Sequence, residues 1–160
     1  MRVVIAAVGR LKVGPERLLF ERYRARFEAA GRRLGLAPVV VGETSESQAS
    51  SAEQRRKEEA AALLKLTREA ETLIALHGAG KSRSSEGLAE LLRNVRDAGS
   101  KTMALVVGGP DGLAPDLLAR ASHQVSFGPI TLPHQLARIV LAEQLYRAAT
   151  ILAGHPYHRA

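Results

Sequence analysis

Cysteine is absent from this 160-residue chain, which excludes disulfide bonds and thiolate metal ligands. The chain also lacks any apolar run near the length of about eighteen residues that a membrane-spanning helix needs. Its first apolar stretch, residues 3–8, is too short for a secretory signal peptide. These absences predict a protein without a membrane partner that works in the reducing cytoplasm.

Residue patterns for metal binding or nucleophilic catalysis are also missing. The five histidines form no H-x-x-x-H pair and have no accompanying carboxylate cluster, so no metal site is expected. The stretch Gly78–Ser82 resembles a phosphate-binding loop only superficially, because no glycine lies five residues before Gly80. The chain has no G-x-S-x-G motif, and no G-x-G-x-x-G follows its first strand. A hydrolase elbow and a standard dinucleotide fold are therefore not expected.

The net charge of +7 is concentrated near the N-terminus. Residues 1–35 hold nine Arg and Lys residues against three Glu, which accounts for six of the seven net positive charges. A one-sided basic segment attracts polyanions such as RNA. The same pattern is equally typical of a solvated helix face, so charge alone leaves both interpretations open.

Short apolar runs alternate with helical periodicities along the whole chain. This alternation predicts an α/β fold, a mostly parallel sheet with helices on both faces. No repeat or linker divides the sequence, so residues 1–160 are expected to form a single domain. The expected strands are 3–8, 38–41, 72–77, 103–107 and 124–127, and segment 42–51 is expected to be a mobile loop. The expected helices begin near Pro15, after Ser51, after Ser84 or Ser85, at Pro115 and near His134, and four of them end near Gly35, Ala70, Gly99 and Ala153.

Three expected strands end in turns that are rich in glycine or proline. These turns are 78–80, 108–112 and 128–129. Ligands of open α/β sheets bind beyond the carboxyl ends of the strands, and glycine allows a ligand to approach the backbone closely. One such turn is weak evidence, because glycine often ends strands. Three of them at successive strand ends predict a site built from main-chain groups.

The last expected helix, 134–153, is apolar around most of its circumference. Glu143 and Arg147 form an i,i+4 pair on its narrow polar stripe. An apolar arc this wide must be buried on two sides, either within the core or against a second subunit. For a terminal helix in a chain of this size we interpret the arc as part of a symmetric dimer interface.

Several segments resemble the RlmH family, the small SPOUT-class methyltransferases that modify a pseudouridine of large-subunit ribosomal RNA at N3. The resemblance spans nearly the whole chain. It is most specific near the end, where Thr-Leu-Pro-His-Gln-Leu-Ala-Arg at 131–138 is followed by Glu-Gln-Leu-Tyr-Arg-Ala at 143–148 and Pro-Tyr-His at 156–158. The other matching segments are 7–12, 14–17, 21–23, 74–76, 80–81, 84–86 and 107–113.

The resemblance implies a SPOUT-type fold with a C-terminal trefoil knot over about 72–160. It also implies S-adenosyl-L-methionine as methyl donor, 23S ribosomal RNA on the ribosome as partner, and a homodimer whose site uses both chains. The implied donor contacts lie at the three strand ends selected above. They are Leu76, Gly109, Gly128, Pro129, Ile130, Thr131, Leu132 and Pro133.

Two positions depart from the pattern of the family. His77 stands where the family often has an acidic residue, and this is expected to alter contacts near the donor. Gly128 stands where the family commonly has serine. A loop that binds mainly through its backbone is expected to tolerate that change.

Methyl transfer to N3 requires an in-line approach of the nitrogen to the methyl carbon and loss of the N3 proton. Under the resemblance, His158 is the candidate base, and Tyr157 is the candidate for stacking or orientation. Arg159 is the candidate for phosphate contact, and Arg22 and Arg26 of the basic first helix are candidate RNA contacts. The residue that takes the proton is left open, as is the choice between free RNA, the large subunit and the whole ribosome.

Two other hypotheses are consistent with the residues alone. In the first, the chain is a non-catalytic ribosome-binding factor, its basic helix binds RNA, and the glycine turns are only structural. In the second, a small-molecule enzyme of another α/β class uses the same strand ends. Binding of S-adenosyl-L-methionine and methyl transfer to ribosomes distinguish the three hypotheses.

Overall fold

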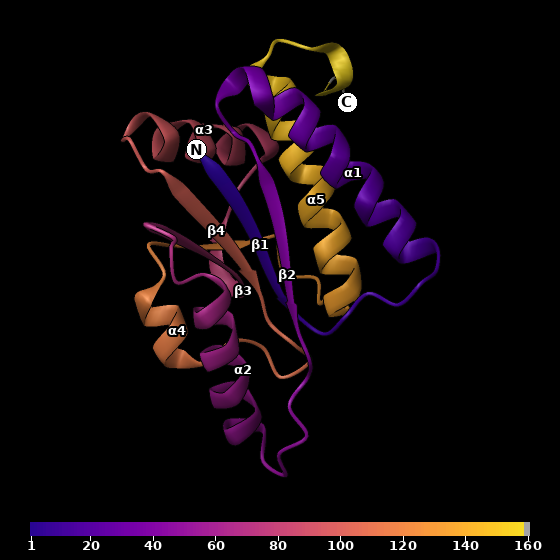
Figure 1. Cartoon of the computed structure of the whole chain (residues 1–160), viewed down its shortest axis with the longest axis vertical. Helices are drawn as coiled ribbons and strands as arrows, with labels where there is room; N and C mark the ends of the chain where they lie inside the picture. The colour runs from indigo at the N-terminus through magenta and orange to yellow at the C-terminus, as the bar shows by residue number, and fades with distance from the viewer. Residues whose placement is uncertain (159–160) are drawn as a thin grey trace.

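The computed structural model describes residues 1–158 (Figure 1). The strands in this part of the chain form a single five-stranded sheet in the order β2-β1-β4-β3-β5, with every pair parallel. The strands are β1 Arg2–Val8, β2 Val39–Thr44, β3 Thr72–Ser82, β4 Thr102–Val107 and β5 His123–Ser126. The helices are α1 Pro15–Gly31, α2 Ala52–Leu66, α3 Ser85–Asp97, α4 Pro115–Arg120 and α5 His134–Leu152, with 3-10 turns at Arg32–Leu34 and Pro156–His158. The predicted alternation and parallel sheet are confirmed.

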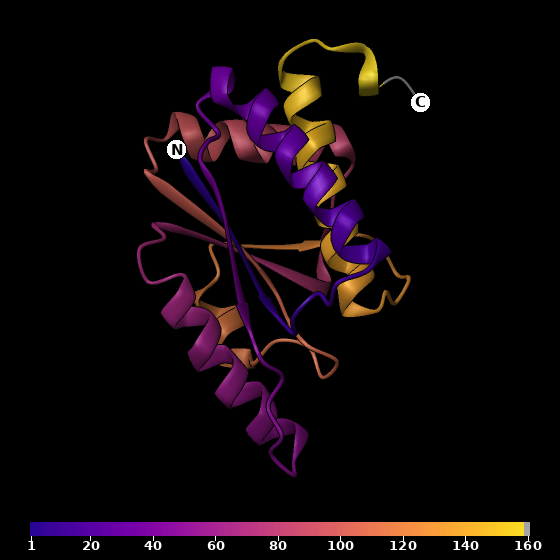
Figure 2. The same ribbon diagram turned by 45° about the vertical axis from the view of Figure 1, so that its right-hand side comes forward.

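Helices cover both faces of the sheet, as predicted. Figures 1 and 2 show α1, α3 and α5 on one face and α2 and α4 on the other. Side chains of each strand alternate between the two cores. In β1, Val3 and Ile5 belong to the core under the first group of helices, whereas Val4 and Ala6 belong to the core under the second. Both faces are buried, which explains why the strands read as continuous apolar runs.

Two strands are longer than the sequence predicts. β2 continues to Thr44, which pairs with Val8 of β1, so the expected loop 42–51 begins three residues later. β3 continues to Ser82, although its glycines suggest a turn after residue 77. The extra strand residues pair with strands far away in sequence. The local residue pattern cannot predict such pairing.

The irregular part of β3 passes close to β5. Leu76 and Lys81 both pair with Val125, on either side of the stretch 77–80. Gly80 makes the close passage sterically possible, because a Cβ there would lie 2.8 Å from the carbonyl carbon of Gln124. The chain around Gly80 is therefore packed directly on the β5 backbone.

The helix boundaries follow the expected caps. The Ser51 hydroxyl accepts a hydrogen bond from the Gln54 amide, and the Ser84 hydroxyl accepts one from the Gly87 amide. α2 ends at Leu66, four residues before the expected end. None of the helices in the described part of the chain combines the length and hydropathy that a bilayer-spanning helix needs.

The apolar arc of α5 is buried inside the chain itself. α5 packs against α1 and α3 above the sheet, and Leu145, Ala148 and Ala149 have no exposed surface. Burial on two sides, which suggested a dimer interface, is thus met by α1, α3 and the sheet. The homodimer remains a prediction, but this helix no longer requires it.

Candidate functional site

The three predicted turns meet in one pocket. In a parallel sheet all carboxyl ends lie at the same edge, and β4, β3 and β5 are adjacent there. The turns after these strands line a cavity of about 830 Å³, within the range of small-molecule and cofactor sites. Its lining includes every donor contact that the resemblance implied: Leu76, Gly109 and the whole loop 128–133.

The turn 108–112 presents its backbone to this cavity. A Cβ on Gly108 would lie 2.8 Å from the carbonyl carbon of Gly112, and one on Gly109 would lie 2.9 Å from Val8 Cγ1. The Gly112 amide donates to the Gly109 carbonyl at 3.0 Å and closes the turn. Two neighbouring residues without side chains leave main-chain donors and acceptors open to a ligand.

Ser126 holds two of the turns together. Its hydroxyl donates to the carbonyl of Gly78 at 3.0 Å and accepts from the amide of Gly128 at 3.1 Å. Gly128 has φ +104, in the region that favours glycine. This conformation explains why glycine suits position 128. Sequence reasoning missed Ser126, because its partner Gly78 is 48 residues away.

Two histidines also line the pocket, His77 and His134. His134 is the first residue of α5, and its Nε2 lies 3.3 Å from Glu46 Oε1. Among the described residues that line the pocket, none is Asp or Glu.

Residues of α2 contact the glycine turn 108–112. Arg55 makes a two-pronged ion pair with Asp111, with Nε–Oδ2 at 2.6 Å and Nη2–Oδ1 at 3.2 Å. This guanidinium lowers the pKa of Asp111. The neighbouring Glu59 is only 4% exposed, and its Oε1 accepts the Ser47 amide at 3.0 Å. Burial raises the pKa of the Glu59 carboxyl above its ordinary value.

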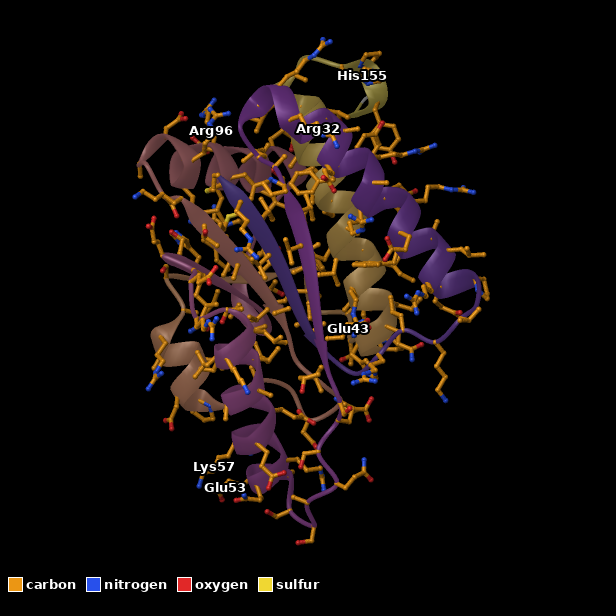
Figure 3. All side chains as sticks on the ribbon, in the orientation of Figure 1. Arg32, Glu43, Glu53, Lys57, Arg96 and His155 are labelled. Atoms are coloured by element: carbon orange, nitrogen blue, oxygen red, sulfur yellow. The ribbon has the colours of Figure 1, made fainter. Side chains whose placement is uncertain are left out.

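Arg138 closes the other half of the same sheet edge. It has no exposed surface, and its Nη2 donates to the carbonyls of Val8 at 2.9 Å and Gly9 at 2.8 Å. Its Nη1 donates to Glu43, which Figure 3 labels between the end of β2 and the start of α5. Burial lowers the pKa of Arg138, while Glu43 opposes that shift. The only sequence signal for this role was an arginine outside the polar stripe of Glu143 and Arg147 in a mostly apolar helix.

The C-terminal turn packs on α5 away from the pocket. The Tyr157 hydroxyl donates to Glu143 Oε1 at 3.2 Å, and its ring lies 4.6 Å from the ring of Tyr146. Arg147 lies over the Tyr157 ring at 5.1 Å. Burial and the neighbouring Tyr23 and Glu143 raise the pKa of Tyr157 to about 12. Tyr157 therefore remains a neutral hydrogen-bond donor at physiological pH.

The other residues selected from sequence fall into two groups. Arg22 and Arg26 are exposed on α1, and the Arg26 guanidinium lies 5.8 Å over the Tyr146 ring. The side chain of His158 and all of Arg159 lie outside the described residues. No trio of histidines and carboxylates within residues 1–158 is close enough to hold a metal ion.

Comparisons with known proteins agree with this geometry. Residues 1–158 match the family model for predicted SPOUT methyltransferases. The chain is 52% identical to ribosomal RNA large subunit methyltransferase H of Nitrobacter hamburgensis, over 99% of both chains. It is 51% identical to the protein of the same name from Rhodopseudomonas palustris, over the full length of both.

Solved structures show the same fold at low sequence identity. A probable methylase family protein from Haemophilus influenzae aligns with a TM-score of 0.53 at 13% identity, covering 99% of this chain and 70% of that one. A probable methyltransferase from Bordetella pertussis aligns with a TM-score of 0.50 at 14% identity, covering 92% and 95%. With its full-length relatives and this fold, the chain belongs to the SPOUT methyltransferase family, alongside the ribosomal RNA large subunit methyltransferase H proteins.

Proposed function

We propose that this protein transfers a methyl group from S-adenosyl-L-methionine to N3 of a pseudouridine in 23S ribosomal RNA, and that it does so in the cytoplasm. As a SPOUT methyltransferase it is an enzyme and uses S-adenosyl-L-methionine as its donor. The names of the full-length relatives support large-subunit ribosomal RNA as the substrate. These relatives also argue against a non-catalytic ribosome-binding factor.

One observation carries the proposal: the turns after β3, β4 and β5 converge on a single cavity of about 830 Å³. This size suits a nucleoside-type ligand. The glycine turn 108–112 and the loop 128–133 offer amides and carbonyls, which suit the donors and acceptors of an adenosine and an amino-acid group. The chemistry of the lining fits the methyl donor.

The residues of the chain contribute mainly by positioning. The donor supplies a methyl group on a positively charged sulfur. The loop 128–133 and the turn 108–112 would hold it, with Ser126 fixing the first of these to Gly78. Fixed geometry for in-line transfer is a large source of rate acceleration. His158 would take the N3 proton, and Arg159, Arg22 and Arg26 would contact the RNA.

We propose a homodimer in which the tail of one chain completes the pocket of the other. Tyr157 packs against Tyr146, which lies twelve residues along α5 from His134 at the pocket, roughly 18 Å. Tyr157, docked there, lies far from the pocket of its own chain. α1 and α5 begin near each other at one end of the molecule (Figures 1 and 2). Exposed apolar side chains at or just before these helix starts offer a surface for a second copy. They are Val13, Leu18, Ile130 and Leu136.

We also propose that the C-terminal part, about residues 72–160 of a single 1–160 domain, is knotted. The support is the close passage of β3 over β5, where Leu76 and Lys81 pair with the same residue, Val125. This packing holds the turn after β3 against the turn after β5, and both of these turns line the cavity.

Two measurements test the function. Calorimetry is expected to show micromolar binding of S-adenosyl-L-methionine by the folded protein. Transfer of tritium from the labelled donor is then expected on ribosomes that lack the modification, with free 23S RNA and isolated large subunits assayed alongside. Donor binding without transfer to any of these would reject the ribosomal substrate, and no donor binding would reject the methyltransferase.

The role of the tail has its own test. A chain ending at Gly154 is expected to fold, bind the donor and lose most methyl transfer, because it lacks Tyr157, His158 and Arg159. Circular dichroism and sedimentation would establish that the shortened chain is folded and dimeric. Methylation by that chain at the full-length rate would overturn the proposed role of the tail.

A further inference from the structure

The pocket presents an electrostatic imbalance. The proposed donor carries a positive charge on sulfur, yet no lining residue in the described part of the chain is Asp or Glu. After methyl transfer, the product S-adenosylhomocysteine is a neutral thioether at the same position. A carboxylate close to the pocket would therefore favour the donor over the product.

Glu59 is the carboxylate best placed for this effect. It lies on α2, directly behind Gly109, which lines the cavity. Its Oε2 and Oε1 lie 3.1 and 3.4 Å from where a Gly109 Cβ would be, beside Val8 Cγ1 at 2.9 Å, so the acid packs directly against a residue that lines the pocket. Because Glu59 is 96% buried, water screens its charge weakly.

Other charged groups around Glu59 do not neutralise it by direct contact. Its Oε1 accepts only the Ser47 amide, and its Oε2 is buried without a hydrogen-bond partner in the described structure. Arg55 is committed to Asp111 by a two-pronged ion pair, and Glu46 is paired with His134. Asp111, Glu46 and Arg55 are the charged side chains that shift the pKa of Glu59.

Glu59 is a buried carboxylate with one oxygen unpartnered in the described structure, and it packs behind a residue that lines the pocket. Ser47 requires only one acceptor, and a neutral glutamine would supply it. Burying an unpaired charge costs stability, so its presence calls for a compensating role. The pocket on the other side of Gly109 supplies one.

We propose that the negative charge of Glu59 makes the adjacent pocket bind the sulfonium donor more tightly than the neutral product. The inference rests on the proposed function. Glu59 does not touch the ligand but acts across the Gly109 backbone. The preference of the enzyme for its donor then depends on α2, which carries none of the sequence motifs of the site.

Calorimetry with S-adenosyl-L-methionine and S-adenosylhomocysteine separates this role from a structural one. Glu59→Gln keeps the shape and the acceptor for Ser47 but removes the charge. It is expected to weaken donor binding about tenfold, ~1.4 kcal/mol, and to leave product binding within about twofold. A merely structural change would weaken both ligands equally, because they share every other group.

Glu58→Gln is the matched control. Glu58 is the next residue of the same helix, is exposed, and also bonds Ser47, through the serine hydroxyl. The same charge change in contact with solvent is expected to alter neither affinity. Equal loss for both ligands in Glu59→Gln, or no change for either, would overturn the inference. Wild-type protein that binds neither ligand would instead reject the proposed function.

A second measurement needs no substitution. In the wild type, the donor-to-product preference is expected to fall as the pH drops and Glu59 takes up a proton, approaching the value of Glu59→Gln. The variant is expected to show a flatter dependence, since Asp111, Glu46 and Arg55 remain in both proteins. A wild-type preference that tracks that of the variant at every pH would contradict the role of the charge.

Discussion

The carboxyl ends of the strands differ between the two halves of the sheet. At β1 and β2, the buried Arg138 bonds the last carbonyls and Glu43, and the edge is closed. At β4, β3 and β5, glycine turns leave the main chain facing a cavity. The buried acid near this open half, Glu59, has an unpartnered oxygen.

This contrast separates a structural use of buried charge from a functional one. Arg138 has three acceptors and ties α5 to the N-terminal strands. Its two terminal nitrogens are both bonded at this edge, and its buried Nε has no partner among the described residues. Glu59 has one donor and an open pocket nearby. The closed half fixes the frame, and the open half exposes groups that remain available for a ligand.

The largest expected effect comes from opening the closed half. Arg138→Met keeps most of the side-chain volume but removes the buried guanidinium that donates to Glu43 and to two strand-end carbonyls, so that Glu43 keeps only the Leu11 amide as donor. We expect the free energy of unfolding to fall by about 3 kcal/mol, as for a buried ion pair broken on one side. Urea denaturation followed by circular dichroism measures this loss.

Arg96→Met provides the comparison on a less buried arginine. Arg96 donates to the carbonyl of Leu34 at 2.8 Å and pairs with Asp97, and about a quarter of its side chain is exposed. A loss of at most about 1 kcal/mol is expected. Equal losses for the two substitutions would mean that the closed half is not specially dependent on its buried charge.

The stability of the open half should instead depend on glycine, where two backbone segments pass too close for a side chain. Gly80→Ala would place a Cβ 2.8 Å from the carbonyl carbon of Gln124 and 2.9 Å from the amide of Val125, both rigid strand atoms. We expect a loss of about 2 kcal/mol, typical of overpacking. Gly78→Ala, two residues away, meets nothing within 4 Å and should change stability by at most about 0.5 kcal/mol. Thermal unfolding of both variants makes the test, and similar melting temperatures would show that the β3–β5 crossing yields easily.

The sequence was most informative where structure follows from local chemistry. The alternation of strands and helices, the caps at Ser51 and Ser84, and the glycine turns all depend on residues within a few positions of each other. The convergence of the turns also followed, because parallel strands place their carboxyl ends at one edge. For this reason the sequence predicted that the three turns meet at one cavity.

The parts that sequence did not reveal depend on distant partners. Arg138 meets Val8 across 130 residues, and Ser126 meets Gly78 across 48. Glu59 was inconspicuous in a helix with many charged residues, because only tertiary packing places it behind Gly109. The wide apolar arc of α5 showed that two sides are buried, but it did not distinguish a neighbouring helix from a second subunit.

Glu59→Gln should sharpen the contrast through stability as well as binding. Burial raises the pKa of Glu59, so the folded protein holds its proton more tightly than the unfolded chain does. The stabilising contribution of the protonated group is complete below the unfolded pKa, about 4.3, and is lost as the pH rises through the higher folded value. We expect the variant to be more stable than the wild type by about 1 kcal/mol at pH 8, and the difference to vanish near pH 4. Urea unfolding at several pH values tests this, and a less stable variant at every pH would mean that the buried charge is well accommodated.

The smallest effect is expected at the boundary of the two halves, where His134 lines the pocket and pairs with Glu46. Glu46 is 42% exposed, so Glu46→Gln should cost at most about 0.5 kcal/mol, and 1 M salt should remove the difference. Glu53→Gln, which breaks the exposed pair with Lys57 at the far end of α2 (Figure 3), is the matched control. Donor affinity should change less in Glu46→Gln than in Glu59→Gln, because solvent screens the exposed carboxylate. A larger change of donor affinity in Glu46→Gln than in Glu59→Gln would mean that the exposed pair of Glu46 and His134 controls the charge of the pocket. The contrast between a closed half and an open half would then not hold at His134.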